Sequence, residues 1–232
     1  MPAPLILLIH GSWLGGWCWR PLAGPLRTHG WRVAAPTLTG LGERQHLGGA
    51  ETGLSAHVAD ILSVLDFTEP GPVILAGHSY GGLVAAEVAG SRPERVTDLI
   101  VMDGPIAAAG LSLFDQMPEL RAAFTAMATD GMVPPPPPDF LGLDPADPAV
   151  TNLRPMPLLT HAEPARYGAD GLTCRRHYLR FVDFPPTAPL AAQAARAGWS
   201  VAELAVGHMG ITTHPDLVAD AMTRLLRPGE DQ

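Results

Sequence analysis

The chain has 232 residues, of which 47% are hydrophobic and 16% charged, and its formal net charge is −8. This length and hydrophobicity predict one folded domain with a well-buried core and exclude a disordered chain, which lacks the apolar surface needed to collapse. The 15 basic residues, against 23 acidic ones, are scattered along the sequence. Nucleic acid is therefore not an expected partner, because binding to a phosphate backbone needs clustered positive charge.

The two cysteines, Cys18 and Cys174, form neither a disulfide framework nor a metal-binding spacing. Free thiols are typical of a reducing compartment. The apolar run Leu5–Ile9 is too short for a signal peptide or a membrane span, and no basic segment precedes it. We therefore expect a cytoplasmic protein with no membrane partner. The sequence leaves the oligomeric state open, and a homodimer is one of the states that it allows.

Six short apolar segments have the length and composition of strands buried in a sheet. They are residues 5–9, 31–35, 73–76, 97–102, 178–182 and 200–205. Helical patterns follow in residues 21–29, 55–65, 82–91, 189–197 and 215–226. Strands that alternate with helices are typical of parallel crossovers, so the sequence predicts an α/β fold with a mainly parallel six-stranded sheet flanked by helices.

The alternation stops between the fourth and fifth predicted strands. This stretch contains five consecutive prolines, Pro134–Pro138, which we interpret as a stiff surface turn because each proline fixes φ and lacks an N–H. Short amphipathic helices around Leu113–Met127 are expected to pack over the carboxyl edge of the sheet. The sequence thus predicts a single domain, 1–232, with a core of residues 1–104 and 172–232 and a cap or lid inserted at about 105–171.

The strongest chemical signal is the segment Gly77-His-Ser-Tyr-Gly81. It lies between a predicted strand and a predicted helix, where a sharp turn exposes one side chain and glycines on either side relieve the crowding. The pattern by itself is only modestly specific, but its strand and helix context favours Ser79 as a nucleophile over an idle serine. Ser79 is therefore the candidate catalytic nucleophile.

A serine hydroxyl needs a base within hydrogen-bond reach. Among nine histidines, His208 follows the last predicted strand directly and precedes a terminal helix. The carboxyl edge of a parallel sheet carries the active loops, so a loop at this place can reach the turn at Ser79. We predict His208 as the base, whereas His78 and His10 are expected to be structural.

The base needs a carboxylate that fixes its tautomer. Two aspartates follow strands in the expected chain order of serine, acid and histidine: Asp183 after the fifth predicted strand and Asp103 after the fourth. We favour Asp183, because the loop after the penultimate strand is expected to lie nearer the histidine loop, and keep Asp103 as the alternative. The backbone N–H groups of Ser12 and Tyr80 are the predicted donors to a developing oxyanion.

The sequence resembles the α/β-hydrolase superfamily and, more closely, a small lidded branch with plant methyl esterases, hydroxynitrile lyases and bacterial esterase homologues. The resemblance covers most of the chain, and the segments that carry it are His10–Trp19, Pro36–Arg44, Gly77–Gly82, Val101–Asp103 and Gly207–His208. It implies a Ser-Asp-His triad, an oxyanion hole from the N–H groups of Ser12 and Tyr80, and no cofactor. In relatives the acid lies one residue further than Asp183, where this chain has Phe184.

Two positions separate esterases from cyanohydrin-cleaving lyases within this branch. Lyases of the plant type carry a threonine after the first strand's histidine and a lysine after the catalytic histidine. This chain has Gly11 and Met209 at those positions, which resembles the esterases.

These observations predict a serine hydrolase that cleaves a small apolar aryl or alkyl ester, or a lactone, through an acyl-enzyme. The expected substrate pocket consists of Gly11, Trp13, Phe114, Met117, Phe124, Met127 and Met209. Non-hydrolytic chemistry on the same fold, such as carbon–carbon cleavage, proton transfer or cyclisation in a biosynthetic pathway, is the alternative. A second alternative function is that of a small-molecule receptor. No metal-ligand cluster, dinucleotide fingerprint or phosphate loop is present.

Overall fold

A six-stranded parallel sheet forms the centre of the computed structural model, which describes residues 4–227. Its strands have the order β2-β1-β3-β4-β7-β8. Their bounds are β1 Leu5–Ile9, β2 Arg32–Ala34, β3 Val73–His78, β4 Val96–Met102, β7 Arg175–Phe181 and β8 Ser200–Leu204. The six predicted strands are thus all present, and the predicted fold class is confirmed.

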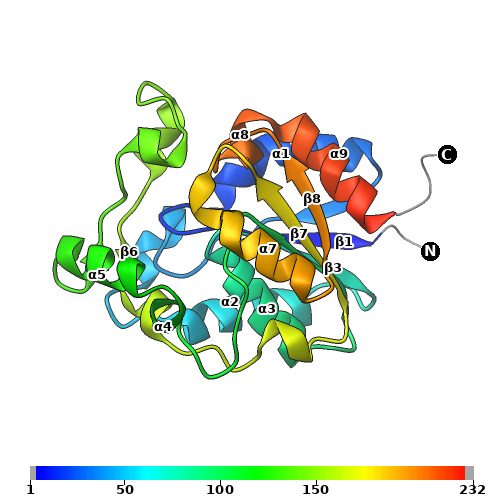
Figure 1. Ribbon diagram of the computed structural model, residues 1–232, viewed down its shortest axis with the longest axis horizontal. Helices are drawn as coiled ribbons and strands as arrows, with labels where there is room; N and C mark the ends of the chain where they lie inside the picture. Colours follow the sequence, from blue (N-terminus) through cyan, green and yellow to red (C-terminus); the bar gives the residue numbers. More distant parts are fainter. Residues whose placement is uncertain (1–3, 228–232) are drawn as a thin grey trace.

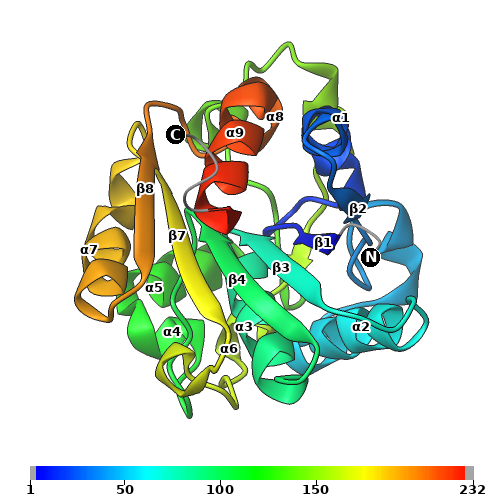
Figure 2. The same cartoon turned by 90° about the vertical axis from the view of Figure 1, so that its right-hand side faces the viewer.

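Helices cover both faces of this sheet. Helices α1 (Arg20–Thr28) and α9 (Pro215–Leu226) pack against each other on one face. Helices α2 (Leu54–Asp66), α3 (Gly81–Ser91) and α7 (Ala188–Arg196) lie on the other face, as Figures 1 and 2 show. Because both faces are covered, all six residues of the central strand β3 are buried, which explains its unbroken apolar sequence.

The segment between β4 and β7, residues 103–174, is here called the insertion. It contains the helices α4 (Leu113–Gln116), α5 (Pro118–Met127) and α6 (Leu159–Ala162) and the short antiparallel strands β5 (Met132–Val133) and β6 (Met156–Pro157). Figure 1 shows α4 and α5 at the end of the molecule opposite to the chain termini, which is where the carboxyl ends of the strands point. The helices expected around residues 113–127 are therefore present.

Local sequence explains how the insertion folds. Ser112 and Asp115 form a capping box that begins α4, in which Ser112 Oγ accepts from the Asp115 N–H and the Asp115 carboxylate accepts from the Ser112 N–H. The proline run has no regular structure before a single 3-10 turn at Pro138–Leu141. Its chain path is fixed by proline φ angles rather than by a hydrogen-bond ladder.

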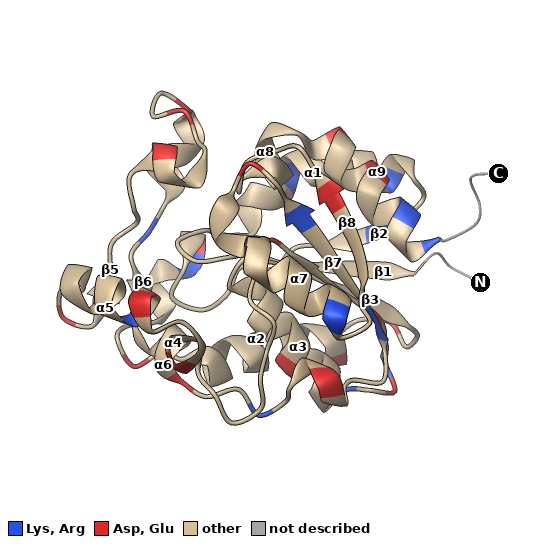
Figure 3. Cartoon of the chain, in the orientation of Figure 1, with Lys and Arg blue, Asp and Glu red and all other residues tan. Residues whose placement is uncertain are grey.

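The surface carries no strongly one-sided charge in the view of Figure 3, where acidic and basic residues are interspersed over helices and loops. No helix within residues 4–227 is long and apolar enough to cross a membrane. Cys18 and Cys174 are both free thiols.

Candidate active site

Ser79 lies at the apex of the sharp turn between β3 and α3. β3 ends at His78 and α3 begins at Gly81, and Ser79 itself has a φ of 52°, a conformation that a residue with a side chain adopts only under local strain. The glycines make this path sterically accessible. A Cβ on Gly77 would overlap the backbone of Gly81, and a Cβ on Gly81 would overlap the carbonyl oxygen of Ile9. The turn therefore requires glycine at both positions.

His208 is held by a buried carboxylate. It lies in the loop between β8 and α8 (Gly210–Thr213), and its Nδ1 is 2.6 Å from Oδ2 of Asp103. The other oxygen of Asp103 accepts hydrogen bonds from Oγ1 of Thr187 and, at 3.3 Å, from the backbone N–H of Phe181. Because Nδ1–H donates to the carboxylate, Nε2 is the nitrogen of His208 left to act as a base.

Asp183, the favoured acid in the sequence analysis, does not contact His208. It is exposed, two residues after the end of β7, and the alternative Asp103 occupies the place beside Nδ1. Strand order alone favours Asp183, since β7 lies directly beside β8. The preference was wrong because the end of β7 and the chain after it turn the Phe181 N–H and the Thr187 hydroxyl toward Asp103, whose carboxylate reaches past β7 to His208. The ring of Phe184, which follows Asp183, instead covers the His208 imidazole, with centroids 4.2 Å apart.

The two predicted oxyanion donors lie beside the nucleophile. Ser12 and Tyr80 line the same cavity as Ser79, and their backbone N–H groups have no acceptor within residues 4–227. The first-strand loop approaches the turn so closely that a Cβ on Gly11 would lie 2.9 Å from Cβ of Ser79. Unpaired N–H groups beside a nucleophile can stabilise a developing oxyanion, so these two remain the candidate donors.

His10 fixes the path of the loop that carries Ser12. Its Nε2 accepts from the N–H of Leu38 at 3.0 Å, so its Nδ1–H donates to the carbonyl oxygen of Gly11 at 2.9 Å. Complete burial lowers the pKa of His10 to about 4, which keeps the ring neutral at physiological pH. His10 is thus a structural residue, as expected.

His78 is structural as well. Its Nε2–H donates to the carbonyl oxygen of His208 at 2.8 Å, and burial holds the pKa of His78 well below its usual value. This hydrogen bond ties the strand that delivers Ser79 to the loop that carries the base.

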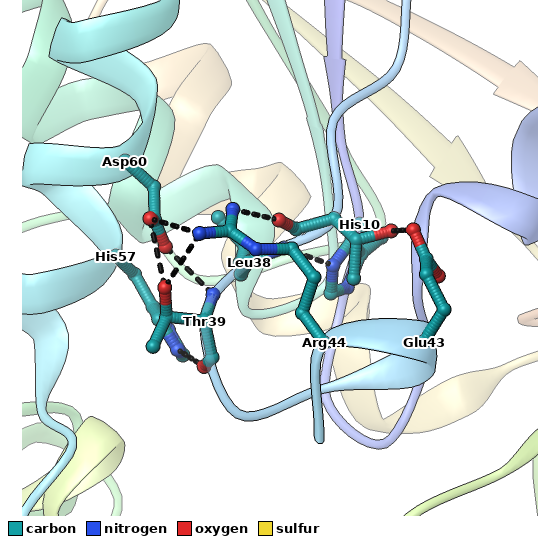
Figure 4. A network of polar contacts seen from close by, with 8 residues as sticks. His10, Leu38, Thr39, Glu43, Arg44, His57 and Asp60 are labelled. Atoms are coloured by element: carbon teal, nitrogen blue, oxygen red, sulfur yellow. Dashed lines mark hydrogen bonds and ion pairs between the residues drawn. The ribbon is translucent and has the colours of Figure 1, made fainter. Parts of the chain in front are cut away.

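A network of hydrogen bonds begins at the Tyr80 hydroxyl and stabilises the turn at Ser79. Figure 4 shows the part of this network that contains His57, Thr39, Asp60 and Arg44. Tyr80 donates its hydroxyl proton to Nδ1 of His57 at 3.0 Å, and Nε2–H of His57 donates to the carbonyl oxygen of Thr39 at 2.8 Å. Thr39 in turn donates to the carboxylate of Asp60, which forms an ion pair with Arg44 at 3.2 Å. The position of the Tyr80 N–H is therefore fixed through its own side chain.

A cavity of about 420 Å³ opens above Ser79, His208 and Asp103. Four of the predicted pocket residues line it: Trp13, Met117, Phe124 and Met127. Two prolines of the proline run, Pro136 and Pro137, also line it, so this run is part of the cavity wall and not only a surface turn. Met127 and Phe140 are 40% and 57% exposed while lining the cavity, which marks its mouth.

Three predicted pocket residues lie elsewhere. Phe114 is buried behind the wall, where its ring packs edge-on against Phe124 with centroids 6.0 Å apart, and its neighbour Leu113 faces the cavity instead. Gly11 and Met209 line only a narrow gap next to Ser79 and His208. The correction for Phe114 follows from helix geometry, because adjacent residues of α4 point in different directions.

Within residues 4–227, no group of three or more His, Cys, Asp or Glu side chains has the arrangement of a metal site. The alpha/beta hydrolase family model matches residues 6–221 of the chain. The chain belongs to the alpha/beta hydrolase family. This membership confirms the resemblance drawn from the sequence motifs.

Relatives of this hydrolase include named esterases. It is 30% identical to a carbendazim hydrolyzing esterase of Nocardioides sp. (strain SG-4G), over 94% of this chain and 98% of that protein. It is 32% identical to a putative methylesterase 15 of Arabidopsis thaliana, over 49% of this chain and 26% of that protein. Its fold matches that of an extracellular α/β-hydrolase from a Paenibacillus species, with a TM-score of 0.80, 22% identity and coverage of 96% and 98% of the two chains.

Two residues of this hydrolase's site were not predicted from the sequence. Phe184 stacks on the His208 ring, and Thr187 donates to Asp103 from the 3-10 turn at Pro185–Thr187. The departure from the family pattern at Phe184 was a signal that the acid had to come from elsewhere. For Thr187 the sequence carries no signal, because a hydroxyl in a turn is too common to single out.

Thr187→Val is expected to lower kcat/KM for ester hydrolysis by about 10- to 100-fold, since a hydrogen bond to a charged group contributes about 1.5–3 kcal/mol. The change removes a donor to Asp103 while it keeps the size of the side chain. Steady-state hydrolysis of p-nitrophenyl butyrate measures it, and Thr187→Ser, which retains the hydroxyl, is the matched control. Equal rates for the valine and serine variants would contradict a role of this hydroxyl.

Proposed function

We propose that this enzyme cleaves a small apolar carboxylic ester, aryl or alkyl, or a lactone, by way of an acyl-enzyme. The observation that carries the proposal is a largely apolar cavity onto which Ser79 and His208 both open, with the buried Asp103 carboxylate on Nδ1 of His208. A ligand pocket of about 300–1,000 Å³ is usual for small molecules, and this cavity is at the lower end of that range. The esterase relatives support the same reaction class.

In the proposed mechanism Oγ of Ser79 attacks the acyl carbon while Nε2 of His208 takes the hydroxyl proton. The carboxylate of Asp103 stabilises the imidazolium that forms. The N–H groups of Ser12 and Tyr80 donate to the oxyanion of the tetrahedral intermediate. His208 then gives its proton to the departing alkoxide, and the alcohol leaves an acyl group on Ser79.

Deacylation repeats these steps with water as the nucleophile. His208 takes a proton from water, the hydroxide adds to the acyl carbon, and the intermediate collapses to release the acid and restore the Ser79 hydroxyl. Every proton taken by His208 is returned within the cycle. Residues of the insertion such as Met117, Leu120 and Phe124 form an apolar ceiling that suits a hydrocarbon acyl or alcohol group.

A fluorophosphonate probe tests this proposal directly. We expect one phosphonyl adduct per chain, located on the peptide that contains Ser79 by mass spectrometry, together with turnover of p-nitrophenyl acetate and butyrate. Heat-unfolded protein is the control and should remain unlabelled, because an unactivated serine is a poor nucleophile. A folded protein that neither acquires the adduct nor hydrolyses either ester would refute the proposed function.

A further inference from the structure

The cavity contains a polar group that the proposed mechanism does not use. His161, in α6 of the insertion, is 2% exposed and lines the cavity opposite the sheet. Its ring stacks on Tyr80, with centroids 4.9 Å apart and planes at 15°, and it also contacts the ring of Phe124 at 5.2 Å. A buried imidazole among aromatic rings, directly above the residue after the nucleophile, is positioned to touch a substrate.

Hydrogen bonds determine which nitrogen of His161 carries the proton. Oγ1 of Thr160 lies 2.7 Å from the carbonyl oxygen of Pro157, to which it donates its only proton. The same oxygen lies 2.8 Å from Nδ1 of His161, so it must accept there, and Nδ1 carries the hydrogen. Nε2 is therefore a lone-pair acceptor. Burial lowers the pKa of His161 to about 3, so the ring stays neutral and this acceptor persists at neutral pH.

This acceptor is only weakly satisfied. Among the described residues its one hydrogen-bond partner is the hydroxyl of Ser12, at the long distance of 3.4 Å. Ser12 also lines the cavity, and its backbone N–H is the proposed oxyanion donor. Covalent geometry places the backbone nitrogen and Oγ of one serine about 3 Å apart, so both atoms lie near the position of the substrate carbonyl oxygen.

We propose that Nε2 of His161 and Oγ of Ser12 form a specificity subsite for a hydroxyl or N–H group of the substrate. That group is carried by the α carbon, the carbon bonded to the ester carbonyl on its acyl side. This inference rests on the proposed ester hydrolysis and adds the substrate class, an ester with a hydrogen-bond donor at the α position. An apolar pocket with one fixed acceptor discriminates strongly, because an acceptor left without a donor in the bound complex is costly. The substrate group donates a hydrogen bond to Nε2 directly, or to Oγ of Ser12 while the serine hydroxyl donates to Nε2.

Three phenyl esters that differ only at the α substituent test the subsite. Phenyl glycolate carries the hydroxyl, phenyl methoxyacetate has the same electron-withdrawing oxygen without a donor, and phenyl propanoate matches the glycolate in size. The measured quantity is the ratio of kcat/KM for the glycolate to that for each other ester. Comparing this ratio between enzyme variants cancels the intrinsic reactivity of the esters.

In wild type the glycolate is expected to be the preferred ester. His161→Phe is expected to lower the preference about 3- to 10-fold, the range for losing one ordinary hydrogen bond. His161→Gln, whose amide oxygen also accepts, should keep part of the preference. The matched control is Phe124→Leu, which alters packing around His161 and should change the rates of all three esters by a similar factor. A preference in His161→Phe equal to that of wild type would overturn the inference.

A binding measurement separates failure of this inference from failure of the proposed function. The dissociation constants of the same esters are measured by calorimetry with Ser79→Ala protein, with and without His161→Phe. If wild type hydrolyses none of the esters, the proposed function fails, yet a preference for binding the glycolate that depends on His161 still supports the subsite. Binding that does not distinguish the esters, or no binding of any of them, overturns the subsite whatever the outcome for hydrolysis.

Discussion

Asp103→Asn is expected to lower kcat/KM for p-nitrophenyl butyrate by about 10⁴-fold, the effect known for the same change in a serine-protease triad. The structure explains why an asparagine would be so damaging. The Thr187 hydroxyl and the Phe181 N–H both donate to one carboxylate oxygen, so the amide oxygen of an asparagine would take that place. Its NH₂ group would then face Nδ1 of His208, and the imidazole would have to carry its proton on Nε2, the nitrogen that must act as the base.

Asp183→Asn is the matched control for this change. Asp183 is exposed and lies two residues after the end of β7, so its substitution should leave kcat/KM within about twofold of wild type. The comparison uses steady-state rates together with the melting temperature of each variant, so that a loss of folded protein is not mistaken for a loss of chemistry. A larger loss of activity in Asp183→Asn than in Asp103→Asn would show that Asp183, in the loop after β7, is the acid of the triad.

Ser79→Ala is expected to lower kcat/KM for the same ester by about 10⁵-fold or more, because removing the nucleophile removes the acyl-enzyme route altogether. What remains comes from binding and from the oxyanion donors of Ser12 and Tyr80, whose N–H groups the substitution leaves in place. Hydrolysis is followed by release of p-nitrophenol, with the uncatalysed rate in buffer as the lower limit. The comparison variant is Ser12→Ala, which keeps its backbone N–H and should lose far less activity.

Turnover that survives Ser79→Ala would exclude the acyl-enzyme mechanism. His208 would then act on water or on the substrate directly, as in the non-hydrolytic chemistry kept as an alternative. A wild-type protein that binds small apolar molecules without converting them would instead favour a receptor.

Local geometry explains why the candidate nucleophile and base could be located from the sequence. The turn at Ser79 needs glycines at fixed distances along the chain, and the overlaps that a Cβ would make at Gly77 and Gly81 are the physical basis of that pattern. His208 could be placed because the chain leaves the last strand at the carboxyl edge of the sheet, which every parallel strand shares. The first prediction needed only the glycine spacing, and the second only the direction of the strands.

The acid could not be chosen in the same way, because its position depends on contacts between loops that are distant in the sequence. Both chain order and strand order place the loop of Asp183 nearer to His208. Asp103 is instead brought to His208 by side-chain contacts with Thr187 and the Phe181 N–H, which the sequence does not reveal. The prediction of the residues that line the cavity had a similar ambiguity. Hydrophobicity does not distinguish Leu113, which faces the cavity, from Phe114, which is buried behind it. His161 gave no signal at all, since its role depends on contacts with distant residues.

The hydrogen bond between Asp103 and His208 joins residues 105 positions apart, across a sheet in which every neighbouring pair of strands is parallel. Such sheets contain no hairpins, so each strand pairing closes a long loop. The entropy cost of closing that loop comes before the stabilising contacts form, which makes folding slow. The site is complete only when the edge strand β8 and the loop after it lie beside β7, because that loop carries His208. Recovery of enzymatic rate after dilution from denaturant therefore reports formation of the whole sheet, including its last strand, rather than formation of the central strands alone.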